Sequence, residues 1–369
     1  MKIVIITPIF QNMVGGAAIY YDQLSSNLAK YAEVAVISEK SQESKRTSSS
    51  IKVIDLFPEW AGRNKTFASY FKYVWQNIRY FDLIHILKEL SPDYTLVHSF
   101  FYKHPGTFPW IMEKTIRRFP HTGFVLDVRD RSIASNKKKY LEQYDFLISC
   151  SENVSLHLKH TIGIQNKIEQ IPVIQIPLKK LLSNINPSKK IKPFLGSNYV
   201  FYAGAIKEDK KVDVLLEAFV STVSSKKPDV HLLLAGPLKS KSKKIRKLLD
   251  HPSVHWLGRL NRDEVICLTA NAGLIVNLSP IESMSRICLE AIDLGKPVIL
   301  PPNVPEYERS CPEFVVGNTD PKDIGQFMLE VMDDQKSPDY PIELHHTAAV
   351  MKRYYQVFGL KPGFQAKFD

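Results

Sequence analysis

The sequence contains no apolar run long enough to cross a bilayer as a helix, which argues against a membrane-spanning architecture. Its N-terminus lacks the charged, apolar and small-residue regions of a signal peptide, because residues 2–6 already have the pattern of a strand. Cysteine is scarce, and its four copies are widely spaced without the pairing typical of a metal site: Cys150, Cys267, Cys288 and Cys311. We therefore expect a cytoplasmic protein with reduced core thiols.

Two ligand-binding motifs are absent as well. The first strand is followed by Gly15 and Gly16 and then by apolar residues at helical spacing, but the complete G-x-G-x-x-G pattern does not occur. Such a strand–glycine–helix unit either contacts a phosphate or an acceptor, or its glycines have only a backbone role. The sequence also contains no Asp-x-Asp motif that could hold a metal ion.

Positive charge is in excess, since 49 Lys and Arg residues face 38 Asp and Glu residues and give a formal net charge of +11. This balance favours an anionic partner, such as membrane lipid, nucleic acid or a phosphorylated substrate. The dense basic run over residues 239–247 has no interleaved aromatic residues, which argues against nucleic acid. The length of 369 residues is enough for two domains.

Residues 60–90 combine aromatic and basic side chains. Apolar residues recur there at helical spacing with basic residues between them: Phe67, Tyr70, Phe71, Val74, Trp75, Ile78 and Phe81, and Arg63, Lys65, Lys72 and Arg79. Such a stripe usually packs into a core. The same mixture also suits a surface against anionic lipid, so peripheral membrane contact is the alternative hypothesis.

The most informative stretch is residues 279–290, with the sequence SPIESMSRICLE. An apolar strand pattern leads into a polar turn, and the turn opens a helix that ends at Gly295. Glu282 lies in the turn, and Glu290 lies eight positions later, about two turns into the helix. The backbone amides between them face the helix N-terminus, which favours an anion. Two carboxylates around such a turn suit a nucleotide sugar; the alternative is a helix with two solvated glutamates.

Polar residues also follow two other predicted strands. Asp127, Arg129 and Asp130 end the strand that begins at Gly123, and His98 ends a shorter strand. Open α/β sheets bind ligands at the carboxyl ends of their strands, so these residues are candidates for a ligand cleft. In the alternative interpretation, an Arg–Asp pair fixes the loop, and the histidine packs or forms a hydrogen bond.

The Glu-x7-Glu spacing, with Glu-Ala and Gly-Lys-Pro-Val behind it, resembles glycosyltransferase family 4, the group 1 retaining enzymes of the GT-B fold. The resemblance implies an α/β protein with two doubly wound, Rossmann-like domains that face one cleft. Residues 1–182 would bind the acceptor, residues 183–198 would form a linker, and residues 199–345 would bind the nucleotide sugar. A C-terminal helix at about 346–369 would pack back on the first domain.

The resemblance also implies roles for single residues in the second domain. Glu282 would bind the transferred sugar and Lys210 the donor phosphate, and both would act in catalysis. Glu290 would bind ribose hydroxyls. The amides of residues 283–287 would stabilise the leaving diphosphate together with Lys210. The further donor-binding residues would be Gly15, Gly16, Gly204, Lys207, Arg259, Ser283, Met284, Ser285, Arg286 and Ile287.

One loop departs from the family's Gly-Arg-x-x-x-x-Lys-Gly pattern. Ala205 stands in the arginine position and Lys211 in the second glycine position. The chain thus lacks one of two expected phosphate-binding cations, and Lys207, Arg259 or Arg286 could supply the missing charge.

In the first domain, Asp-x-Arg-Asp resembles the variant that some bacterial members carry where others have a histidine. Asp127 and Asp130 would then be catalytic residues that orient an acceptor hydroxyl, with Arg129 and His98 beside the acceptor.

The implied function is transfer of a sugar, with retention, from a UDP- or GDP-linked donor to a saccharide or lipid-linked acceptor in surface polysaccharide or glycoconjugate synthesis. The family needs no metal, so no cofactor is expected. The alternatives are a GT-B sugar-nucleotide epimerase or phosphorylase, and a non-catalytic protein that binds sugar nucleotides on the same scaffold. The expected partners include an anionic membrane surface, with the protein peripheral on the inner face, but no nucleic acid.

Overall fold

The computed structural model describes residues 1–8, 10, 16–39, 51–57, 68–102, 108–165 and 167–360, with backbone only at 39, 57, 68–78 and 101. Gly15 and the first part of the aromatic and basic segment therefore lie outside the described residues. The chain divides into two compact units. Unit 1 is Met1–Ile174 with Thr347–Asp369, and unit 2 is Gln175–His346.

Unit 1 is built on a parallel sheet of seven strands in the order β3-β2-β1-β4-β5-β6-β7. The strands are β1 (Lys2–Ile6), β2 (Glu33–Glu39), β3 (Ile51–Phe57), β4 (Tyr94–His98), β5 (Gly123–Val128), β6 (Phe146–Ser149) and β7 (Ile168–Gln170). Ile5 in β1 is paired with Val36 on one side and Leu96 on the other. Strand β1 consists of consecutive apolar residues after Lys2, and such a continuous apolar run is typical of parallel strands covered on both faces.

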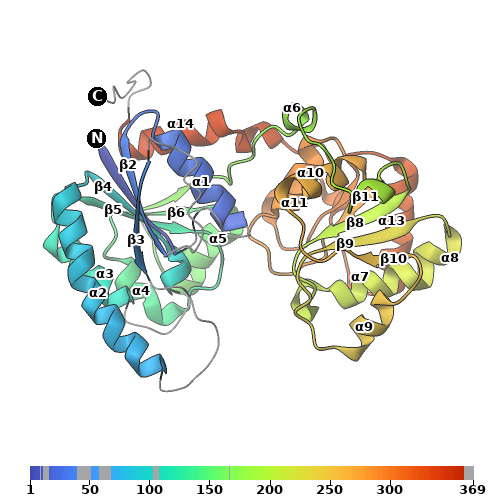
Figure 1. Ribbon diagram of the computed structural model, residues 1–369, viewed down its shortest axis with the longest axis horizontal. Helices are drawn as coiled ribbons and strands as arrows, with labels where there is room; N and C mark the ends of the chain where they lie inside the picture. Colours follow the sequence, from blue (N-terminus) through green and yellow to red (C-terminus); the bar gives the residue numbers. More distant parts are fainter. Residues whose placement is uncertain are drawn as a thin grey trace. The chain divides into compact units, whose positions relative to one another are not determined.

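Helices cover both faces of this sheet (Figure 1). They are α1 (Gly16–Leu28), α2 (Ala68–Leu90), α3 (Phe108–Arg118), α4 (Lys138–Leu141), α5 (Glu152–Leu156) and α14 (Thr347–Phe358). The C-terminal helix α14 lies beside α1 in Figure 1, and its Tyr354 and Phe358 are buried in one core with Tyr20 and Leu24 of α1. The end of the chain thus completes the core that its beginning forms.

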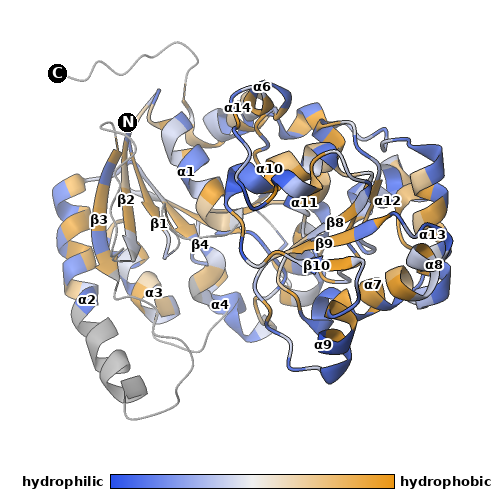
Figure 2. Cartoon of the chain, turned by 45° about the vertical axis from the view of Figure 1, so that its right-hand side comes forward, coloured by the Kyte–Doolittle hydropathy of each residue, from blue (hydrophilic) through white to orange (hydrophobic). Residues whose placement is uncertain are grey.

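Unit 2 has a parallel sheet of five strands in the order β10-β9-β8-β11-β12. The strands are β8 (Tyr199–Ala203), β9 (His231–Ala235), β10 (Val254–Trp256), β11 (Leu274–Val276) and β12 (Val298–Ile299). Figure 2 shows β9 largely in the hydrophobic colour, between helices of mixed colour. The chain runs from β8 outward to β10 and then returns to β11, which is paired directly with β8 through Leu274 and Val200.

The helices of unit 2 lie on both faces of this sheet. Helices α7, α9 and α13 pack together on one face of the sheet, whereas α10 and α11 pack together on the other (Figure 1). The helices are α6 (Lys179–Leu182), α7 (Val212–Ala218), α8 (Ser224–Lys226), α9 (Lys243–Leu249), α10 (Arg262–Asn271), α11 (Arg286–Asp293), α12 (Pro305–Ser310) and α13 (Pro321–Asp334). The strand order therefore reverses between β8 and β11, and such a switch point is where open α/β sheets bind ligands.

Residues 183–198, expected as a linker, are instead packed within unit 2. Ile191 is fully buried, and the Ser188 hydroxyl donates to Glu264 of α10 at 2.6 Å. The polar composition that suggested a linker is explained by such local hydrogen bonds. None of the helices in the described part of the chain is long and apolar enough to span a bilayer.

Candidate active site

The loops after β8 and β11 meet at the switch point of unit 2, because these two strands are neighbours. The first loop runs from Gly204 into a short 3-10 helix, Glu208–Lys210. The residue that follows this helix, Lys211, has a left-handed φ of 55°. The second loop runs from Asn277 to the start of α11. Each loop contributes one charged side chain to the same place.

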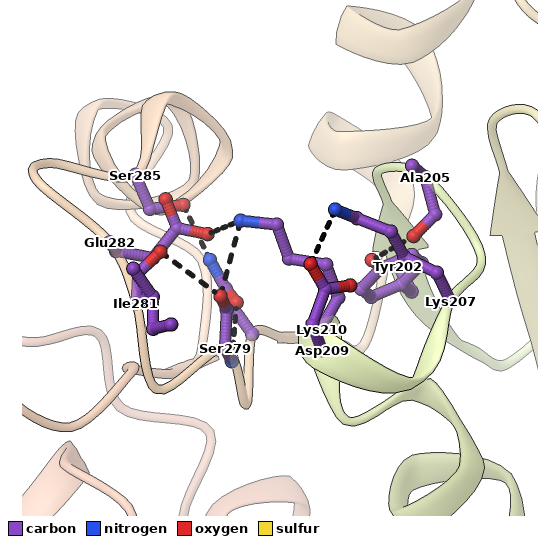
Figure 3. Close-up of polar contacts among 10 residues, drawn as sticks. Tyr202, Ala205, Lys207, Asp209, Lys210, Ser279, Ile281, Glu282 and Ser285 are labelled. Carbon is purple, nitrogen blue, oxygen red and sulfur yellow. Dashed lines mark hydrogen bonds and ion pairs between the residues drawn. The ribbon is translucent and has the colours of Figure 1, made fainter. Parts of the chain in front are cut away.

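Lys210 and Glu282 form the centre of this site (Figure 3). The Lys210 Nζ lies 2.6 Å from Glu282 Oε1 and 3.2 Å from the Ser279 hydroxyl. The two charged side chains are 28% and 19% exposed, so both remain accessible to a ligand. The structure thus brings together two residues that are 72 positions apart in the sequence.

Asn277 holds the second loop in shape. It is 5% exposed, its Oδ1 accepts a hydrogen bond from the Ser279 backbone N–H at 3.0 Å, and its amide nitrogen donates to the Ser285 hydroxyl at 2.7 Å. Sequence reasoning missed this residue. The available signal was a polar residue at the carboxyl end of an apolar strand, where ligand-supporting groups concentrate.

Glycines let the neighbouring loops approach each other closely. The Gly236 N–H donates to the Gly258 carbonyl at 2.7 Å, and the Gly204 N–H donates to the Ala235 carbonyl at 2.8 Å. Gly236 has a φ of 140°, and a Cβ atom there would lie 1.9 Å from the Gly204 carbonyl oxygen. The loop that carries Lys210 is therefore supported by direct backbone contact.

Helix α11 begins at Arg286, later than the sequence suggested, so Glu290 lies one turn inside it rather than two. Ser285 is the N-cap residue but makes no side-chain cap hydrogen bond. The first amides of the helix, including that of Ile287, are therefore not capped by Ser285, and a helix N-terminus of this kind favours an anion. Ser283 and Met284 lie in the preceding turn and are partly buried.

Glu290 is 1% exposed, and its Oε1 accepts a hydrogen bond from the Arg262 guanidinium of α10. Burial raises the pKa of the Glu290 carboxyl, while the positive charges of Arg262 and Arg286 oppose that rise. Arg262 was not among the predicted site residues, since its contact with Glu290 joins two helices.

The other predicted cations occupy different surroundings. Lys207 forms an ion pair with Asp209 at 2.6 Å on the first loop (Figure 3). Arg259 lies after β10 and is exposed. Arg286 is the first residue of α11, and its charge opposes the rise in the pKa of Glu290 that burial causes. Lys210 contacts Glu282 directly.

In unit 1, Asp127 and Arg129 form a buried pair at the end of β5. Asp127 is fully buried and accepts hydrogen bonds from the Tyr21 hydroxyl at 2.8 Å and from Arg129 Nη1 at 3.2 Å. The Arg129 guanidinium carbon lies 3.6 Å from the centre of the Tyr20 ring. Burial raises the pKa of Asp127, while Arg129 and Tyr21 oppose the rise. Tyr20 and Tyr21 of α1 were not among the predicted site residues, but they contact Arg129 and Asp127 directly.

The remaining predicted residues of unit 1 contact polar groups within the same unit. His98 Nδ1 lies 3.1 Å from the Thr7 hydroxyl, and Asp130 accepts a hydrogen bond from the Ser132 backbone N–H at 3.0 Å. Gly16 is the first residue of α1. Among the described residues, no group of three or more His, Cys, Asp or Glu side chains is placed to hold a metal ion.

Comparisons with known proteins bear on this site. Residues 184–344 match the family model described as "Glycosyl transferases group 1". A search of the curated proteins found no match.

Solved structures resemble the chain at low sequence identity. Anabaena HepE in complex with UDP-glucose has a TM-score of 0.68 and 13% identity, over 97% of this chain and 98% of that one. A glycosyltransferase from Rickettsia africae ESF-5 has a TM-score of 0.65 and 16% identity, over 97% of each chain. A UDP-forming α,α-trehalose-phosphate synthase from Burkholderia xenovorans, in complex with glucose-6-phosphate, has a TM-score of 0.67 and 11% identity, over 97% and 100%. These likenesses confirm the predicted GT-B fold with its two parallel α/β sheets.

Proposed function

Because the chain carries a group 1 glycosyltransferase domain over residues 184–344, we propose that it transfers a sugar, with retention, from a nucleotide diphosphate sugar to a saccharide or lipid-linked acceptor. The observation that carries this proposal is the contact of 2.6 Å between Lys210 and Glu282 at the switch point of unit 2. A cation and a carboxylate held side by side suit a donor that presents phosphate oxygens next to sugar hydroxyls.

The proposed chemistry is cleavage of the bond between the sugar and the diphosphate. The bonding electrons leave with the diphosphate oxygen, so negative charge grows there while the sugar approaches an oxocarbenium-like state. Lys210 and the amides at the start of α11 would stabilise the leaving diphosphate without reorganisation. Glu282 would accept hydrogen bonds from hydroxyls of the transferred sugar and hold it beside the same lysine.

We propose UDP as the nucleotide and unit 1 as the acceptor-binding part. The first choice is supported by the solved relatives that bind UDP-glucose or form UDP. The second is supported by the position of Arg129 and His98 at the carboxyl ends of β5 and β4, where parallel sheets bind ligands. Asp127 and Asp130 would act there by orienting the acceptor, and synthesis of surface polysaccharide or glycoconjugates is the proposed pathway.

The test combines ligand binding with transfer. A thermal-shift panel of UDP, GDP and ADP with their common sugars, each with and without EDTA, should give a shift for the UDP series that EDTA does not change. Product analysis separates the alternatives, because an epimerised free sugar nucleotide or a dependence on phosphate would contradict transfer. No shift with any nucleotide would contradict the proposal.

Variants of the central pair test the mechanism. Lys210→Met should lower the transfer rate by about 10²- to 10³-fold, because it removes a charge that stabilises the leaving group. Its unfolding free energy should change by less than about 1 kcal/mol, because the pair is partly exposed. Lys244→Met is the matched control, since Lys244 also forms a 2.6 Å ion pair, with Glu217, on exposed α9. Equal transfer rates in the two variants would refute the role of Lys210.

We also propose that unit 1 contacts an anionic membrane surface. Its residues include 26 Lys and Arg against 17 Asp and Glu, so it carries most of the net charge of the chain. Phe81 of α2 is 71% exposed and Trp110 of α3 is 39% exposed, and Lys114 Nζ lies 3.8 Å from the centre of the Trp110 ring. Helix α3 ends with Arg117 and Arg118. Exposed aromatic residues beside basic ones suit an anionic bilayer.

Liposome co-sedimentation tests this surface. Binding should need phosphatidylglycerol, fall with salt, and weaken in a Phe81→Ser, Trp110→Ser variant. Leu344→Ser in unit 2 is the control, because Leu344 is also an exposed apolar residue, at 46%. Binding that ignores both lipid charge and salt would contradict the proposal.

A further inference from the structure

Arg262 has a defined place at the start of α10. It is the first helical residue, and the preceding Asn261 forms a capping box with Glu264, in which both reciprocal hydrogen bonds are 2.9 Å long. A capping box satisfies backbone donors that a helix N-terminus otherwise leaves unpaired, and so it fixes the first turn. The direction in which the Arg262 side chain leaves the helix is therefore well determined, and it reaches Glu290 of α11.

The two partners are buried to very different extents. The Glu290 side chain is 1% exposed, whereas that of Arg262 is 30% exposed. Arg262 therefore contacts an almost fully buried carboxylate while part of its own side chain remains exposed. A buried carboxylate stays ionised only when it is paired, and Glu290 is in direct contact with Arg262, with Arg286 as a second nearby positive charge.

This arrangement creates a competition if ribose hydroxyls of the donor bind Glu290, as the family resemblance implies. Two ribose hydroxyls can donate to the two oxygens of a carboxylate, but Glu290 is covered while Arg262 pairs with it. Hydroxyls that take the place of Arg262 would release a guanidinium with five N–H donors. A diphosphate carries the oxygens that a guanidinium binds best. Lys207, which the sequence offered as a phosphate-binding cation, is already paired with Asp209 at 2.6 Å.

We propose that Arg262 is an exchangeable counter-ion of Glu290: the ribose of the donor displaces it, and it then binds the diphosphate as a second cation beside Lys210. This inference rests on the proposed function, because it needs a nucleotide diphosphate in the site. It assigns Arg262 a ligand-binding role that depends on the phosphates and opposes the binding of a nucleoside alone.

Calorimetric titration with UDP and uridine tests the exchange. Arg262→Gln keeps a neutral hydrogen-bond donor for Glu290 but removes the charge. Its affinity for UDP should fall by about tenfold to hundredfold, as expected for loss of one charged hydrogen bond. Its affinity for uridine should stay the same or rise, because the nucleoside no longer competes with an ion pair. Arg246→Gln on exposed α9 is the control and should change neither affinity.

A second pair of variants gives the same comparison if Arg262→Gln does not fold. Arg262→Met combined with Glu290→Gln contains no buried charge at this position, and its reference is Glu290→Gln alone. The double variant should bind UDP more weakly than the reference and bind uridine equally well.

The possible outcomes separate the exchange from the proposed function. Equal weakening of UDP and uridine binding would overturn the exchange, since Arg262 would then only position Glu290. Unchanged affinities for both ligands would overturn it too, since the pair would then be structural. If the wild-type protein binds neither UDP nor GDP, the proposed function fails, and the exchange fails with it.

Discussion

Replacing Gly236 by alanine should destabilise unit 2 far more than an ordinary glycine substitution. The new Cβ atom would lie 1.9 Å from the Gly204 carbonyl oxygen, whereas Cβ contacts under 3.0 Å essentially never occur. The opposing atom belongs to the backbone and cannot rotate away. The φ of 140° at Gly236 adds strain for any residue with a side chain.

The magnitude follows from these two effects. Overpacking in a close contact costs about 1–3 kcal/mol, and a backbone conformation of this kind costs about 1–3 kcal/mol. We expect a total of about 3–5 kcal/mol, which corresponds to a fall in Tm of about 6–20 °C for a unit of this size. Scanning calorimetry measures the fall, and hydrogen exchange of peptides from β8 and β9 assigns it to unit 2.

Two control glycines separate the causes. Gly258→Ala meets no atom within 4 Å but keeps a φ of 64°, so it should cost only about 1 kcal/mol. Gly317→Ala meets neither obstacle and should be close to neutral. If Gly236→Ala is no more destabilising than Gly258→Ala, the backbone contact with Gly204 does not support the lysine-bearing loop, and our account of the site is wrong.

Three further variants test other parts of the structure. Lys211→Gly should raise the unfolding free energy by about 0.5–1 kcal/mol, because Lys211 has a left-handed φ of 55°; a fall measured by urea denaturation would contradict this. Burial raises the pKa of Asp127, so its ionisation costs stability as the pH rises from about 4 through the folded-state pKa. The loss of unfolding free energy caused by Asp127→Asn should therefore become smaller between pH 4 and pH 7. A loss that becomes larger over that range would show that the charge of Arg129 lowers the pKa of Asp127 more than burial raises it. Asn277→Ala should cost about 2–3 kcal/mol and weaken donor binding in the thermal-shift assay, because two buried hydrogen bonds are lost; an unaltered nucleotide shift would show that the loop keeps its shape without them.

The fold was largely predictable, because parallel strands have a distinct local pattern. The pattern over residues 2–6 predicted β1, and the stretch that leads into and includes 279–290 predicted a strand, a turn and a helix. The group 1 glycosyltransferase model matches residues 184–344, which include this motif, and the solved structures confirm the fold that it indicated. Each signal depends on residues close in sequence, where hydrophobic periodicity is informative.

The site was less predictable, because its contacts join distant segments. Glu282 and Lys210 were both predicted, but the pairing of Glu290 with Arg262 depends on how α10 packs against α11. The helix start was predicted too early, since the Ser285 backbone is extended and its hydroxyl is bound to Asn277. Sequence patterns identify polar residues at strand ends, but they do not say which of them pair with each other.

The place of α14 in the core of unit 1 has a consequence for how the chain is made. Val350, Met351, Tyr354 and Phe358 all come from the last part of the sequence, yet their side chains are buried against the first helix. A ribosome must synthesise the 172 residues from Gln175 to His346 before α14 exists, which takes roughly 9–34 s at typical elongation rates. Throughout that time the nascent first unit exposes the apolar face that α14 later covers. The first unit to be synthesised is therefore the last to be completed, and a chain truncated before Thr347 would leave that face open to chaperones and aggregation.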